Sequence, residues 1–236
     1  EDRNAFQEFD HVRLFSACSK WTRRVHTVER VEDYVDQAFA VACSGRPGPV
    51  VLLFPNDMLD KPAAPETRTV SLGHYPLDPV LPPAEAVRGV AERLLSSRNP
   101  VIVAGGGVHL SSACAALAEL QETFSLPVAT TVMGKGSVDE RHPLSLGVMA
   151  NATGPGSASR HQRAILEEAD FILLVGTRTD QNATDSWRLY PSGAVFAHID
   201  MDSCEVGRNY EAMRLVGDAR LTLETLAETM QIGRAH

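Results

Sequence analysis

The chain has 236 residues, of which 44% are hydrophobic and 22% charged, a balance typical of a folded protein with one large domain or two smaller ones. Its formal net charge is −8 and it has no basic block, which argues against nucleic acid as a partner. The apolar runs are too short to cross a bilayer and the opening EDRNAFQEFD does not look like a signal peptide, so we expect no membrane association.

Four cysteines are scattered along the chain without a CxxC pair, namely Cys18, Cys43, Cys114 and Cys204. This pattern is typical of free, buried thiols in a reducing cytoplasm rather than of a disulfide framework, so we expect a cytoplasmic location. No histidine or cysteine cluster has the spacing of a metal-ligand set, and we expect no metal site.

The first sixty residues offer one long amphipathic helix, expected at 28–44, and a strand at 50–54. One helix and one or two strands cannot close a core, so we expect the chain to begin partway through a domain that ends at residue 61. A strand near Phe54 would leave an exposed edge, which predicts association, most simply as a dimer. Residues 62–83 hold six of the fourteen prolines, and we expect an extended linker over 62–82.

Residues 83–232 alternate between apolar strands and helices. The strands are expected at 101–104, 126–132, 171–175, 194–199 and 215–216, and the helices at 111–124, 161–169 and 219–230. Ser111 or Ser112 is a suitable N-cap for the first of these helices. Strands that are apolar throughout indicate a parallel sheet covered on both faces. The sequence therefore predicts a doubly wound α/β domain.

Loops rich in glycine, threonine and aspartate follow the predicted strands, where such folds bind ligands. Glycines allow close approach of a phosphate, and an arginine such as Arg178 supplies a forked, charge-assisted contact. Other interpretations remain open. The glycines can serve tight turns alone, since Leu110 stands where a GxGxxG fingerprint needs its third glycine. Asp218 can cap the last helix, and Arg178 can pair with Asp180 or Asp185.

Several segments occur in an order that is specific as a set: NAFQEFD, SACSKW, GRPGPVVLLFPND, NPVIVAGGGV, LPVATTVMGKG, ILLVGTRTD, AHIDMDSCEVGRNY and VGDA. Together they resemble thiamine-diphosphate-dependent enzymes of the acetolactate synthase group. The resemblance implies the end of a pyrimidine-binding domain, a linker, and a DHS-like central domain. It also implies a homo-oligomeric parent enzyme, a carboligase or decarboxylase of small 2-keto acids, that uses thiamine diphosphate and magnesium.

Two motifs of that family are not found here: the glutamate that activates the aminopyrimidine, and the GDG motif, followed by asparagine, that holds magnesium and diphosphate. The single Gly-Asp pair is Gly217–Asp218, in the central domain. We therefore expect a portion of a longer enzyme that is inactive alone and whose partners are the missing domains or a second copy of the chain. The resemblance places Phe6, Gln7 and Lys20 near the substrate entrance, where a cation suits an anionic 2-keto acid.

In this family the central domain holds FAD in acetolactate synthases, holds ADP in oxalyl-CoA decarboxylases, and is largely empty in pyruvate decarboxylases. The positions that match the FAD pattern are Gly105, Gly106, Gly107, Thr130, Thr131, Met133, Gly147, Gly176, Thr177, Arg178, Asp180, Asp200, Met201, Gly217, Asp218 and Ala219. Two departures leave FAD, ADP and an empty pocket open: Asn182 stands in place of a second arginine, and GVMA at 147–150 replaces GMHG.

Two further hypotheses compete with an enzyme portion. One is a stand-alone module that binds FAD or ADP. The other, an NAD-dependent dehydrogenase, is disfavoured because no catalytic constellation of histidine or tyrosine can be identified and the glycine fingerprint fails.

Overall fold

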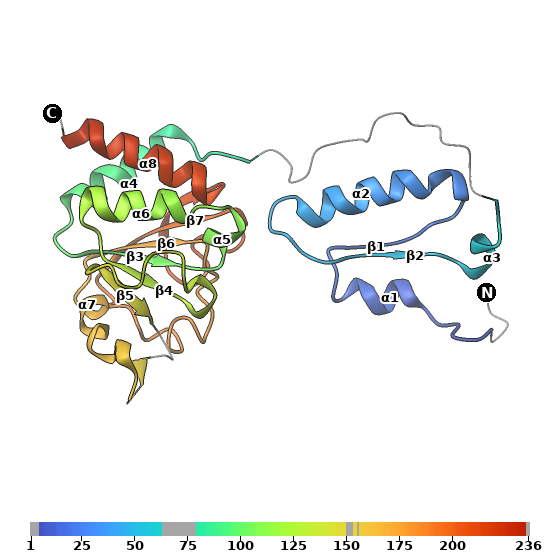
Figure 1. The fold of residues 1–236 in the computed structure, drawn as a ribbon, viewed down its shortest axis with the longest axis horizontal. Helices are drawn as coiled ribbons and strands as arrows, with labels where there is room; N and C mark the ends of the chain where they lie inside the picture. The colour runs from blue at the N-terminus through green and yellow to red at the C-terminus, as the bar shows by residue number, and fades with distance from the viewer. Residues whose placement is uncertain (1–4, 63–78, 150–152, 155, 235–236) are drawn as a thin grey trace. The chain divides into compact units, whose positions relative to one another are not determined.

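A computed structural model describes residues 5–62, 79–149, 153–154 and 156–234 of the protein (Figure 1). The chain divides into two compact units, Glu1–Asp78 and Pro79–His236.

The first unit contains a two-stranded parallel sheet with helices beside it. Its elements are α1 (His11–Ser16), β1 (Trp21–Arg24), the 3-10 turn η1 (Val28–Arg30), α2 (Val31–Cys43), β2 (Val50–Leu53) and α3 (Asn56–Leu59). Each strand has one partner within the described residues. The sequence VEDYVDQAFAVAC places apolar residues three and four apart, which is why α2 forms and presents one side to the strands.

The core of the first unit is small. Among its described residues only four side chains are buried: Thr22, Val25, Ala38 and Met58. Large hydrophobic side chains remain exposed on α1, α2, α3 and their connections: Phe6, Phe9, Val12, Leu14, Phe39, Phe54 and Leu59. The unit therefore buries little apolar surface for its size. A two-stranded sheet is also only marginally stable by itself.

The second unit is built on a six-stranded parallel sheet. In spatial order its strands are β5 (Ser145–Val148), β4 (Val128–Thr130), β3 (Pro100–Ala104), β6 (Phe171–Val175), β7 (Val195–Asp200) and β8 (Ala212–Val216). The central strand β6 reads FILLV and is buried at every residue, because helices and loops cover both faces of the sheet. The predicted doubly wound α/β fold is thus confirmed.

The helices of the second unit divide between the two faces of the sheet, as Figure 1 shows. One face is covered by α4 (Ala84–Ser96), α6 (Cys114–Phe124) and α8 (Ala219–Arg234), which enclose the larger core cluster around Leu117, Phe171 and Leu223. The short helices η4 (Ala158–His161) and α7 (Arg163–Glu167), with the long segment after β6, lie on the other face. There they enclose a second cluster around Ile172 and Leu189.

Several predicted boundaries are wrong. The helix expected at 111–124 begins only at Cys114, as α6, and a separate short helix, α5 (Gly107–Leu110), precedes it. Neither serine caps α6, because Ser112 has a left-handed φ of 55° and Ala113 is the N-cap. The strand expected at 126–132 shortens to β4, since Thr131 caps the 3-10 turn η2 (Val132–Gly134). The edge strand β5 and the helices α1, α3 and α4 were not predicted as elements.

The expectation of buried thiols is also wrong. Cys18 and Cys204 are exposed, Cys43 and Cys114 are half-buried, and all four are free. Among the helices of the described residues, none is long and apolar enough to span a membrane.

Candidate functional site

The chain changes direction across the sheet at the neighbouring strands β3 and β6. From β3 it continues to β4 and β5 on one side, and then returns through β6 to β7 and β8 on the other. In open α/β sheets, ligands bind at such a switch point, outside the carboxyl ends of the strands. The loops after β3 and β6 therefore define the candidate site, and both contain glycines that the sequence marks as candidates.

Three of those glycines contact one another rather than an open space. The amide of Gly107 donates to the carbonyl of Gly176 (3.0 Å), and the amide of Gly105 donates to that of Val175 (2.8 Å). A Cβ added to Gly107 would lie 2.6 Å from Gly176 Cα, and one on Gly105 would lie 2.3 Å from the Gly176 oxygen. Gly176 itself has a φ of +58°. The two loops can thus pack backbone to backbone only because side chains are absent.

Gly106 differs from these neighbours. A Cβ there would lie 3.2 Å from Met133 Cβ, so Met133 would have to move by a few tenths of an ångström, a milder conflict than at Gly105 or Gly107. The Met133 side chain is 75% exposed at the carboxyl edge. Apolar surface therefore lies open beside the glycine loop.

Arg178 follows β6 and extends to the surface. Within the described part of the chain it makes no hydrogen bond or ion pair, so the pairing considered with Asp180 or Asp185 is not formed. Asp180 Oδ1 instead accepts from the amide three residues on (2.9 Å), and Asp185 pairs with Arg163 (3.0 Å). Asn182 is exposed on the same segment. Arg178 is therefore available to an anion at the switch point.

The loop after β4 uses its threonines internally. Thr130 is buried and its hydroxyl lies 3.4 Å from the carbonyl of Gly147, while Thr131 Oγ1 accepts from the amide of Gly134 (3.1 Å). Gly147 lies on β5 with a φ of +69°. Of the GVMA segment at 147–150, residue 150 is outside the described residues.

At the end of β7, Asp200 and Met201 are half-buried. Asp200 Oδ1 accepts from the amide of Asp202 (2.9 Å), a contact that shapes the turn after the strand. The carboxylate is thus already engaged by the backbone.

At the end of β8 the candidate residues have structural roles. A Cβ on Gly217 would lie 2.6 Å from the carbonyl of Val80. Asp218 Oδ1 accepts from the amide of Leu221 (3.0 Å), so this carboxylate caps α8. Ala219 is buried in the larger core cluster. Of the two interpretations of Asp218, the helix cap is the one observed.

His198 on β7 is a polar residue of the site that the sequence analysis missed. Its ring is 1% exposed; Nε2 donates to the carbonyl of Thr177 (2.9 Å) and Nδ1 accepts from the amide of Gly207 (3.3 Å). Burial lowers the pKa of His198 to about 4, and the charge of Arg214 acts in the same direction. The sequence could have indicated this role, because a histidine within the apolar run AVFAHI must be buried with the rest of the strand. The neutral ring joins the loops after β6 and β7.

Phe6, Gln7 and Lys20 belong to the first unit, whereas the other candidate residues belong to the second. Phe6 is 92% exposed and Gln7 has a left-handed φ of 61°. Lys20 Nζ donates to the carbonyls of Val41 (2.7 Å), Ser44 (2.7 Å) and Arg46 (2.9 Å). All three protons of its ammonium group are therefore used at the carboxyl end of α2, where a helix favours a cation.

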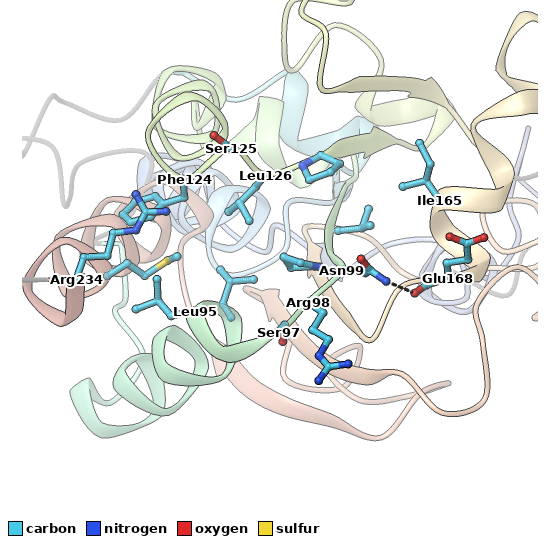
Figure 2. A pocket seen from close by; sticks show the side chains of 15 residues that line it. Leu95, Ser97, Arg98, Asn99, Phe124, Ser125, Leu126, Ile165, Glu168 and Arg234 are labelled. Carbon is cyan, nitrogen blue, oxygen red and sulfur yellow. Dashed lines mark hydrogen bonds between the residues drawn. The ribbon is translucent and has the colours of Figure 1, made fainter.

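A cavity of about 540 Å³ lies at the opposite, amino edge of the sheet (Figure 2). It lies among the ends of α4, α6 and α8, and its polar lining includes Arg98, Asn99, Glu168 and Arg234. The Asn99 amide donates to the carbonyl of Glu168 (3.2 Å), and the Arg234 guanidinium lies 4.6 Å from the Phe124 ring centre. None of the predicted site residues lines this cavity.

A doubly wound sheet with its candidate residues at the switch point defines a class of ligand-binding α/β domains. Comparison with known families narrows this class: residues 87–226 match the model described as thiamine pyrophosphate enzyme, central domain. The chain belongs to this family.

Curated relatives extend the similarity beyond the central domain. The chain is 33% identical to the "Probable acetolactate synthase large subunit" of Methanococcus aeolicus, over 96% of this chain and 38% of that protein. It is 35% identical to the protein of the same name from Methanocaldococcus jannaschii, over 94% of this chain and 38% of that protein. The chain thus spans about two fifths of the length of these relatives.

A solved structure gives the same picture. It is an X-ray structure of a Mycobacterium smegmatis protein assigned to the thiamin diphosphate-dependent enzymes. The match has a TM-score of 0.77 and 26% identity, and it covers 94% of this chain and 41% of that one.

Proposed function

We propose that this chain is a portion of a thiamine-diphosphate-dependent enzyme of the acetolactate synthase type, a carboligase or decarboxylase of 2-keto acids. In this proposal residues 1–61 end a pyrimidine-binding domain, 62–82 form the linker, and 83–232 form the central domain. The observation that carries it is the extent of the similarity, which covers 96% of the chain and therefore both units.

The first unit supports a role within a larger assembly. Among its described residues, four side chains are buried and seven large hydrophobic side chains are exposed. In the described part of the second unit, buried hydrophobic side chains far outnumber exposed large ones. Such a surface needs a covering partner to exclude water. In the proposal that partner is the remainder of the pyrimidine-binding domain or a second copy of the chain, in a homo-oligomer.

The residues present do not fit thiamine diphosphate and magnesium. The single Gly-Asp pair packs Gly217 against the chain at Val80 and uses the Asp218 carboxylate to cap α8. In the described part of the chain, no group of three or more potential ligands is placed to hold a metal. We therefore assign no catalytic step to residues of this chain.

Two experiments test the enzyme proposal. Incubation of the chain with thiamine diphosphate, Mg²⁺ and pyruvate should release no CO₂ above the blank, and measurable turnover would show that the chain is a complete catalyst. Reading the gene on both sides of this segment should show a glutamate-bearing half-domain upstream and a GDG motif downstream. Stop codons at both ends of the segment would contradict the assignment to a longer enzyme.

One observation favours a second candidate, binding of FAD or ADP at the carboxyl edge. Arg178 is exposed and has no partner within the described residues, and Met133, which follows another strand at the same edge of the sheet, presents an exposed apolar side chain. A guanidinium is well suited to a diphosphate. Asn182, in place of a second arginine, favours ADP over FAD because one contact of the larger nucleotide is lost.

Titration calorimetry with FAD, ADP and NAD tests this binding directly. Arg178→Ala should weaken the nucleotide's affinity by about tenfold or more, as loss of a charge-assisted pair does. Arg98→Ala is the matched control, because Arg98 is also exposed but lines the cavity at the other edge of the sheet. Absence of heat with all three nucleotides, or equal affinity of the Arg178→Ala variant and the unmodified chain, would reject the nucleotide site.

A further inference from the structure

The four cysteines differ in their surroundings. Cys18 and Cys204 are exposed, whereas Cys43 and Cys114 are half-buried. Exposure alone would make Cys18 and Cys204 the most reactive thiols. Cys114, however, has an imidazole within hydrogen-bond distance, which distinguishes it in chemistry rather than in access.

Cys114 and His109 form a hydrogen-bonded pair. The sulfur of Cys114 lies 3.6 Å from His109 Nδ1, and His109 Nε2 lies 3.1 Å from the carbonyl oxygen of Lys135. A carbonyl only accepts, so Nε2 of the neutral ring carries the proton and Nδ1 presents its lone pair to the thiol. The ring is thus held by a backbone acceptor on one side and accepts from the thiol on the other.

Cys114 stands at the start of a helix, close in sequence to the short helix that carries His109. It is the first residue of α6, an eleven-residue helix, and the N-cap Ala113 offers no side-chain acceptor to the first amides. α5, which carries His109, follows β3 at the carboxyl edge of the sheet (Figure 1), so the pair lies on the edge that contains the switch point.

We propose that Cys114 is a reactive thiol, that His109 is its base, and that the pair undergoes thiol–disulfide exchange with small disulfides. The proposal is independent of the enzyme assignment above. The Cys114 proton passes to His109 Nδ1, and the thiolate attacks one sulfur of the disulfide. A new S–S bond forms to Cys114 as the original S–S bond breaks, and the leaving thiolate takes the proton from the imidazolium. One cysteine thiol is consumed and one small thiol is released.

The exchange disturbs a contact between loops. Once Cys114 carries a mixed disulfide, His109 Nδ1 loses its donor and the added group must fit beside the ring that holds the Lys135 carbonyl. Lys135 follows Gly134, whose backbone packs against Ala104 so closely that a Cβ would lie 2.1 Å from the Ala104 oxygen. Modification therefore acts on the loop after β4 at the carboxyl edge.

The test compares four thiols within one molecule. The intact chain is treated with a limiting amount of 4,4′-dithiodipyridine, a neutral small disulfide, near pH 7, and the modified cysteine is located by peptide mass spectrometry. Cys114 should react about tenfold faster than Cys18 or Cys204, because His109 is positioned to take the thiol proton as the sulfur attacks. If the exposed Cys18 and Cys204 react as fast as Cys114, the proposal fails.

A variant identifies the base. His109→Gln should slow the reaction of Cys114 about tenfold and leave that of Cys204, the internal control, unchanged. An unchanged Cys114 rate would remove His109 from the proposal and overturn it. The comparison of the four thiols in the unmodified chain decides the question even if this variant does not fold.

Discussion

Burial of His198 predicts a loss of stability on acidification that can be calculated. The pKa of this histidine falls from its ordinary value of 6.5 to about 4 in the folded protein, chiefly because burial penalises the charged ring. Above pH 6.5 both states are neutral and the group contributes no pH dependence. Between pH 6.5 and 4 the unfolded chain binds a proton that the folded chain does not, so stability falls as pH falls. Below pH 4 both states are charged and the loss is complete.

The size of this effect follows from the difference between the pKa of 6.5 in the unfolded chain and the pKa of about 4 in the folded protein. At about 1.4 kcal/mol for each pH unit between the two pKa values, acidification through this window lowers the free energy of unfolding by roughly 3 kcal/mol on account of His198. The structural reason is that a doubly protonated ring cannot accept from the amide of Gly207 while it donates to the carbonyl of Thr177. Protonation thus breaks the link between the loops after β6 and β7.

Urea unfolding at several pH values between 7 and 4 measures this loss. In a Trp21→Phe background, the fluorescence of Trp187 reports on the second unit alone. His198→Gln should be less stable at pH 7, yet lose about 3 kcal/mol less than the unsubstituted chain on acidification. His161→Gln, which changes an exposed histidine, is the control, and its free energy of unfolding should fall with pH as steeply as that of the unsubstituted chain. The reasoning from burial is refuted if the chains with and without His198 lose the same free energy of unfolding between pH 7 and pH 4, to within about 1 kcal/mol.

Other contacts give simpler predictions. Gly107→Ala places a Cβ 2.6 Å from the backbone of the loop after β6 and should cost about 1–3 kcal/mol of stability by urea unfolding, whereas Gly193→Ala, which meets nothing within 4 Å, should be nearly neutral. Lys20→Met removes three hydrogen bonds at the end of α2 and should speed hydrogen exchange in that helix; Lys61→Met should not, and equal protection would dismiss the capping role. Asp218→Ala should cost about 1 kcal/mol as a lost cap, mostly restored by Asp218→Asn; an unchanged midpoint for the alanine variant would argue against the cap.

The parts of the fold that were predictable are those that burial dictates. The run Phe171–Val175 was predicted with both boundaries correct, because five consecutive apolar residues are what a strand covered on both faces requires. The edge strand β5 was missed because Ser145–Val148 is short and mostly half-buried, so it shows no continuous apolar signal. The start of α6 was misplaced because Ser112 adopts a left-handed conformation, which its residue type does not announce.

Within the candidate site, positions were easier to predict than roles. Topology alone brings the loops after β3 and β6 together, so the glycines there were expected at one edge. Whether a glycine faces a ligand or another loop depends on tertiary packing, and Gly105, Gly107 and Gly176 face each other. The same limit applies to Lys20, whose partners lie 21 to 26 residues away in sequence.

This packing changes what the glycine-rich loops can tell about function. Gly105, Gly107 and Gly176 are required by the contact between two loops, so their presence is explained whether or not a nucleotide binds. Asp218 is likewise explained by its helix. Arg178 is different, because it is exposed at the switch point and, in the described residues, no internal contact accounts for it. The choice between a nucleotide-binding and a purely structural central domain therefore depends on the Arg178 side chain far more than on the glycine motif.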